Sequence, residues 1–241
     1  MSFGDTLFWI ALMQIIGINI VLSGDNAVVI ALAARSLPAH QQQKAVFWGA
    51  GAAVVMRIVL TIFAVQLLKY PYLKLVGAVL LLWIAVKLLL PEHDGDDGID
   101  ASDNLMAAIK TILIADLVMS LDNVIAVAAA AKDSLTLLIL GLGISIPLVI
   151  FGSTLLLKLM DRWPIIITIG AALLGWVAGE MAVSDPLLKE WVDANASWLH
   201  WAAPAVGAVF VVALGKWIAA RAAKVGEAVV DLAERDSKPQ P

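Results

Sequence analysis

The chain has 241 residues, of which 61% are hydrophobic and 15% are charged, and its mean hydropathy is +0.92. Soluble domains are about 45–50% apolar and about 25% charged, so the composition excludes an ordinary soluble domain and indicates a membrane protein. The net charge of −4 and the lack of a basic stripe argue against nucleic acid as a partner. The absence of cysteine excludes disulfides and thiolate metal ligands.

Seven apolar segments are each long enough to cross the hydrocarbon core of a bilayer, which takes about 20 residues. They are expected at residues 7–34, 44–68, 72–90, 104–131, 135–159, 163–182 and 198–220. The first segment lacks the basic start and the cleavage site of a signal peptide, so we expect it to be retained as a span. The sequence therefore predicts an all-α membrane protein with seven transmembrane helices, in contact with the lipid bilayer.

The first and fourth segments contain near copies of one polar motif. The copies are Ser23-Gly24-Asp25-Asn26 and Ser120-Leu121-Asp122-Asn123. Residues 19–35 match residues 116–132 at one offset, and later glycine, proline and tryptophan positions continue the match. Each unit holds three spans, an odd number, so the second unit must enter the membrane the opposite way round. This pattern predicts two inverted three-helix repeats, an organisation that is common in transporters.

The predicted organisation has five parts. They are a first repeat at 1–90, an acidic linker at 91–103, a second repeat at 104–182, a loop and seventh helix at 183–220, and a tail at 221–241. Lysine and arginine residues are more numerous at the span ends that lie on the side of the linker and the tail. The positive-inside rule places that side in the cytoplasm and the N-terminus outside.

The motif also predicts a local irregularity in the first span. Gly24 relaxes a helix, and Ser, Asp and Asn prefer helix N-caps to helix interiors. We therefore expect a break at residues 23–26, followed by a half-helix from about Ala27. Because Leu121 stands in place of Gly24 in the second copy, the break there should be milder.

A carboxylate at membrane depth costs about 2.5–3.5 kcal/mol on insertion scales, so two acids at matching positions indicate a function. The candidate ligands are Asp25, Asn26, Asp122 and Asn123. Their oxygens suit hard cations such as Mg²⁺, Ca²⁺ and Mn²⁺, and two carboxylates would neutralise one divalent ion. No histidine lies at the centre of a span, which disfavours zinc and copper. We expect a divalent cation in transit, with helix capping as the alternative role of the motifs.

Other polar residues near the motifs are candidates for accessory roles. They are Asn19, Asp116, Arg57, Ser23, Ser120, Met119 and Glu180. Asn19 and Asp116 precede the motif aspartates by six residues, so they share a helix face with them only if the segment between unwinds. Arg57, near the centre of the second span, requires a buried carboxylate partner. The candidate partners are Asp25, Asp116 and Asp122.

Two of these accessory residues have a simpler alternative. The thioether of Met119, one turn before Asp122, would favour a transition metal such as Mn²⁺, whereas packing in the core is the ordinary role of methionine. Glu180, near the outer end of the sixth span, fits either an exit path or a position at the membrane interface.

The stretches 20–31 and 116–126, each of which contains one Asp-Asn motif, resemble the TerC family of bacterial membrane proteins, over about residues 5–220. The resemblance implies a multi-pass protein of the bacterial inner membrane that is related to LysE-like transporters and exports manganese. It implies that Asp25, Asn26, Asp122 and Asn123 form the metal site. It leaves Ca²⁺ and Mg²⁺ open as the transported ion.

Other functions remain open on the sequence alone. Carboxylates that exchange a metal for a proton would make transport proton-coupled. A non-transporting partner in a metal or tellurite stress response, or an exporter of a small solute, also fits the composition. An intramembrane aspartyl protease needs two membrane carboxylates too. Duplicated Asp-Asn motifs suit ion ligands better, so we expect no enzyme, and no cofactor besides the transported cation.

Overall fold

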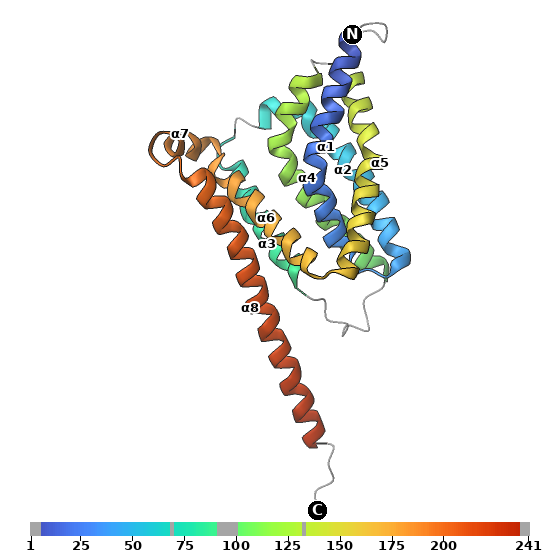
Figure 1. Cartoon of the computed structure of the whole chain (residues 1–241), viewed down its shortest axis with the longest axis vertical. Helices are drawn as coiled ribbons and strands as arrows, with labels where there is room; N and C mark the ends of the chain where they lie inside the picture. Colours follow the sequence, from blue (N-terminus) through green and yellow to red (C-terminus); the bar gives the residue numbers. More distant parts are fainter. Residues whose placement is uncertain (1–5, 68–69, 91–100, 132–133, 237–241) are drawn as a thin grey trace, which may run out of the picture.

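The computed structural model describes residues 6–67, 70–90, 101–131 and 134–236 (Figure 1). Over these ranges it contains eight helices and no strand. In chain order they are α1 (Thr6–Ala34), α2 (Ala39–Leu67), α3 (Leu73–Leu89), α4 (Ala101–Ala131), α5 (Leu135–Arg162), α6 (Ile165–Val183), α7 (Pro186–Asn195) and α8 (Leu199–Asp236). The all-helical prediction is confirmed.

Five helices of the described chain are long and apolar enough to cross a membrane. The segments are Ala39–Phe63, Asn104–Leu121, Thr136–Arg162, Ile165–Val183 and Leu199–Ala222. In α1 the described side chains give two shorter apolar stretches, and α3 has 17 residues. The predicted total of seven spans therefore stays a prediction. The short helix α7 lies where the sequence predicted a loop.

The predicted break in the first span is wrong. Helix α1 runs without interruption from Thr6 to Ala34, and α4 is likewise continuous through Leu121. In a bilayer, backbone groups have no water to bond with, so each broken helical hydrogen bond is costly. That cost exceeds the preference of Gly24 and its polar neighbours for a helix end, which amounts to about 1 kcal/mol per residue.

The helices form two adjoining groups (Figure 1). In the first group α1 packs mainly against α5 and α4, and α2 packs mainly against α4 and α5. In the second group α6 packs against α3 and α8. Two separate apolar clusters fill the interior, one around Ile15 and Leu142, the other around Ile112 and Leu81. The charged residues Arg57 and Asp116 belong to neither cluster.

One end of the bundle carries three pairs of a cation and a tryptophan ring. They are Lys87 over Trp83, Arg162 over Trp163 and Arg221 over Trp217, at 5.6, 5.3 and 3.9 Å from the ring centroids. Other tryptophans are exposed toward the opposite helix ends, among them Trp9, Trp198 and Trp201. Aromatic residues at both ends and cations concentrated at one end are typical of helices that cross a membrane.

The contact between α6 and α8 depends on small residues. On α6 a Cβ atom added at Gly175 would meet the carbonyl oxygen of Gly207, and one added at Gly179 would meet that of Ala203. Gly175 and Gly179 form a GxxxG pattern, which lets two membrane helices approach until their backbones touch. This close approach holds α8 against the second group of helices.

Replacement of Gly179 by alanine is expected to destabilise the protein by about 1–3 kcal/mol, the usual cost of overpacking. The matched control is Gly152→Ala, because a Cβ there would lie 3.5 Å from Ala27 Cβ, an ordinary contact. Thermal unfolding of the two variants in the same detergent measures the difference. Equal midpoints would contradict the close contact.

Asp185 connects two helix N-termini and was not among the residues that the sequence singled out. Its side chain is fully buried and accepts hydrogen bonds from the backbone N–H groups of Leu187 at 2.9 Å, Tyr72 at 3.3 Å and Lys74 at 3.2 Å. It therefore caps α7 and α3 together. Tyr72 has a φ of 70°, an unfavourable value for a bulky residue, and the carboxylate stabilises that turn.

Substitution Asp185→Ala is expected to lower the unfolding free energy by about 1–3 kcal/mol, because several buried amides lose their acceptor. Asp193→Ala is the matched control. That carboxylate is exposed and pairs with His200 at 2.7 Å, and exposed pairs contribute about 0–1 kcal/mol. Thermal unfolding in detergent compares them, and an equal loss from both variants would exclude a shared cap.

Candidate cation site

A buried ion pair links α2 and α4 in the first group of helices. Arg57 Nη2 contacts Asp116 Oδ1, and Arg57 Nε donates to Ser120 Oγ at 3.0 Å. Ser120 in turn donates to Asp116 Oδ2 at 3.3 Å. Arg57 and Asp116 are 4% and 5% exposed, and Ser120 is fully buried. Of the three predicted partners of Arg57, the structure selects Asp116.

The network depends on helical spacing in α4. Asp116, Ser120 and Asn123 follow one another at four and three residues, a spacing that places them along one helix face. Because α4 is continuous, it lacks the unwound segment that Asp116 and the aspartate six residues later would need in order to share a helix face. Asp116 instead accepts a hydrogen bond from Ser120, one turn later on the same face.

Asn26 of the first motif lies beside this network. It is 5% exposed, and it lines a small cavity together with Val29 and Ile30 of α1 and with Ile112 and Asp116 of α4. The cavity measures about 10 Å³, roughly the space that one water molecule needs. The structure thus brings the amide of Asn26 in α1 and the carboxylate of Asp116 in α4 to one small cavity with a largely apolar wall.

Asp25 has a different environment from its neighbour Asn26. Its side chain is half-buried and makes no hydrogen bond or ion pair with any residue in the described part of the chain. Asn123 is also half-buried. A carboxylate at membrane depth without a partner is costly, so the position of Asp25 calls for a functional explanation.

The other candidates are placed less directly. The side chains of Asn19, Ser23 and Asp122 lie outside the described residues, so the meeting of the two Asp-Asn motifs stays a prediction. Met119 is buried in the apolar core, in its ordinary packing role. Glu180 is exposed near the end of α6. Among the described residues, no three histidine, aspartate or glutamate side chains lie close enough together to hold a metal ion.

Comparison with known proteins decides the family. The model of the integral membrane protein TerC family matches residues 4–223. The chain belongs to the TerC family. It is therefore a multi-pass integral membrane protein, and the resemblance carried by the two motifs is confirmed.

Several TerC relatives are themselves described only as membrane proteins. The chain is 45% identical to the uncharacterized membrane protein YjbE of Bacillus subtilis (strain 168) over 182 residues, which are 76% of this chain and 83% of YjbE. It is 27% identical to the inner membrane protein YgdQ of Escherichia coli (strain K12) over 177 residues, which are 66% of this chain and 74% of YgdQ. No solved structure matches the chain.

The ion pair gives a test by paired substitutions. Arg57→Val alone is expected to cost about 3–5 kcal/mol, because it leaves a buried carboxylate uncompensated. The double variant Arg57→Val with Asp116→Asn removes both charges and is expected to recover most of that loss. Thermal unfolding of the single and double variants gives the coupling energy. If the loss of unfolding free energy in the double variant equals the sum of the losses in the two single variants, the ion pair is contradicted.

Proposed function

We propose that this TerC protein exports a divalent metal cation, most readily Mn²⁺, which is bound at mid-membrane by Asp25, Asn26, Asp122 and Asn123. The observation that carries the proposal is Asp25, a half-buried carboxylate without a partner among the described residues, next in sequence to Asn26, which lines a small cavity together with Asp116. An ionisable group in that position is by default part of an ion or substrate path. Oxygen ligands of this kind favour hard divalent cations.

The packing of the helices supports the two inverted repeats. If α1, α2 and α3 correspond to α4, α5 and α6, the contact of α1 with α5 corresponds to that of α4 with α2, and both are extensive. The correspondence extends to side chains. Ile112 of α4 occupies the space beside Gly49 of α2, as Ile15 of α1 does beside Gly141 of α5. In this organisation α1 to α6 and α8 are the seven spans.

The charges of the two repeats also fit one divalent ion. Where the second repeat has Asp116, the first has Asn19, and by the Gly49–Gly141 correspondence the position of Arg57 is taken by Val149. The carboxylate and the guanidinium thus meet where α2 contacts α4, whereas the corresponding positions of α1 and α5 carry Asn19 and Val149. Since Arg57 neutralises Asp116, Asp25 and Asp122 remain as two negative charges for one divalent cation.

The proposed orientation has the N-terminus outside and the acidic linker and tail in the cytoplasm of a bacterium, in its inner membrane. The three cation–tryptophan pairs at the linker end of the bundle support it. Each motif carboxylate binds either a proton or a metal, so metal efflux coupled to proton entry is the proposed mechanism. Catalysis has no part in it.

Transport into proteoliposomes tests the proposal. Purified protein is expected to move Mn²⁺ faster than Ca²⁺ or Mg²⁺, and to respond to an imposed pH gradient. Asp25→Asn and Asp122→Asn are each expected to lower the initial rate about tenfold or more, since loss of 1.4 kcal/mol in cation binding already gives tenfold. Glu180→Gln is the matched control, because that acid is exposed at a helix end, and its rate should be unchanged.

The same measurement separates the alternatives. Rates for all three ions equal to those of empty liposomes would overturn the exporter and leave a non-transporting membrane partner. Transport that survives both aspartate substitutions would move the ion path away from the motifs. A rate that ignores the pH gradient would remove proton coupling alone.

A further inference from the structure

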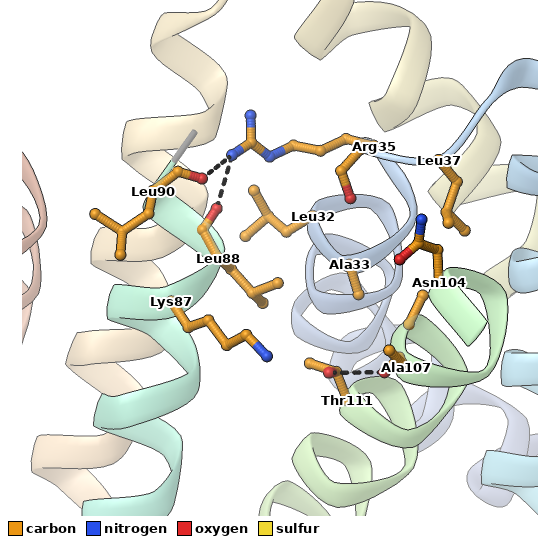
Figure 2. A pocket seen from close by; sticks show the side chains of 12 residues that line it. Leu32, Ala33, Arg35, Leu37, Lys87, Leu88, Leu90, Asn104, Ala107 and Thr111 are labelled. Atoms are coloured by element: carbon orange, nitrogen blue, oxygen red, sulfur yellow. Dashed lines mark hydrogen bonds between the residues drawn. The ribbon is translucent and has the colours of Figure 1, made fainter. Parts of the chain in front are cut away.

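A larger pocket opens at the end of the bundle where the linker connects α3 to α4 (Figure 2). Its volume is about 250 Å³. The lining comes from the C-terminal ends of α1 and α3 and the N-terminal turns of α4, and includes Ala33, Lys87, Asn104, Ala108 and Thr111. We call this space the mouth pocket.

The mouth pocket and the small Asn26–Asp116 cavity lie along the same helix seam. Helix α1 contributes Ala33 to the mouth pocket and Asn26 to the cavity, and α4 contributes Ala108 to the first and Asp116 to the second. The two helices run in opposite directions, so both spaces follow their interface. From Ala108 to Asp116 is eight residues, about 12 Å along a helix at 1.5 Å per residue.

One apolar layer separates the two spaces. Val29 and Ile30 of α1 and Ile112 of α4 are each no more than 2% exposed, and they form the apolar wall of the small cavity. Ile112 sits one turn after Ala108 and one turn before Asp116. Its side chain also fills the space beside Gly49, where an added Cβ would lie 2.7 Å from Ile112 Cδ1. We call these three residues the Ile112 layer.

A second apolar layer lies on the opposite side of the polar residues. Ile15 and Val127 are fully buried in the other apolar cluster, which is separate from the cluster that contains Ile112. Asn26, Asp116 and Ser120 lie between the two layers. A polar segment enclosed by one apolar layer on each side is the arrangement that access from alternate sides requires.

We infer that the mouth pocket is the access vestibule of the ion route and that the Ile112 layer is the barrier between this vestibule and the Asn26–Asp116 cavity. The identity of the cargo rests on the proposed function, whereas the route rests on the geometry of the seam. Ala108 and Thr111 of α4 line the vestibule, and Ile112 and Asp116 line the small cavity, so removal of side-chain volume at Ile112 joins the two spaces.

Two basic side chains line the vestibule. Arg35 Nη2 donates to the carbonyl oxygens of Leu88 and Leu90, at 3.0 Å each, and so lies over the last turn of α3. In Figure 2 the Lys87 ammonium group points into the pocket, toward the side of Thr111. Both cations stand at helix C-termini, where they balance the helix dipoles.

Cysteine labelling in membrane vesicles tests the route, because the chain contains no cysteine of its own. Thr111→Cys in the full chain is expected to react with impermeant methanethiosulfonates from one side of the membrane only. Ser120→Cys and Asn26→Cys lie beyond the barrier and are expected to be protected from these reagents, because both positions are buried.

Opening the barrier should expose the protected positions. Ile112→Ala in the Ser120→Cys and Asn26→Cys backgrounds is expected to raise the labelling rate at least about tenfold, since the deleted side chain leaves space that water can enter. Ile112→Val serves if the alanine variant does not fold. The matched control is Ile84→Ala (or Ile84→Val), because Ile84 is equally buried in the same cluster but lines neither space.

The outcomes are distinct. An unreactive Thr111→Cys in folded protein would overturn the vestibule, and equal labelling after the Ile112 and Ile84 substitutions would overturn the barrier. The labelling pattern needs no transport, so a correct pattern with no ion movement in proteoliposomes would preserve the route and reject the cation exporter. If the protein transports ions but the Ile112 and Ile84 substitutions change the labelling rates equally, the exporter stands and this route is rejected.

Discussion

The ion pair between Arg57 and Asp116 is the constraint around which the centre of the bundle is arranged. In a bilayer an unpaired guanidinium or carboxylate is costly, so each residue requires the other at close range. Their contact fixes α2 against α4, and Ser120 completes it from the same face of α4. Once these two charges are neutralised together, the cavity next to Asn26 has a polar wall that is held in place without a bound ion.

Small residues set how closely the remaining helices approach this centre. The side chain of Ile112 packs against Gly49, and that of Ile15 packs against Gly141. Helices α2 and α5 each therefore pack closely against a helix that carries an Asp-Asn motif. At Gly175 and Gly179 the partner is backbone rather than side chain, and α8 is held there almost rigidly. The difference matters because side-chain contacts can repack during a conformational change, whereas contacts between backbones can only slide or separate.

The sequence predicted the all-helical architecture and an acidic partner for Arg57, whereas the seven spans, the inverted repeats and the metal site stay predictions. Apolar length is enough to locate spans, and a buried arginine demands an acid, so both the helices and an Arg57 partner could be expected; choosing Asp116 required the relative position of α2 and α4. The break at Gly24 was wrong because local propensity is weak beside the cost of unbonded backbone in lipid. Asp185 was overlooked because its second set of partners, in the turn before α3, is more than a hundred residues away.

Two similar helix contacts, that of α2 with α4 and that of α1 with α5, are unequal in charge. At the first contact Arg57 pairs with Asp116, whereas Val149 of α5 and Asn19 of α1 stand at the corresponding positions of the second. The ion pair adjoins the small cavity that Ile112 also lines. Separation of α1 from α4 at Ile112 would therefore bring water to a salt bridge, and hydration of its two charges offsets part of the cost of opening that contact.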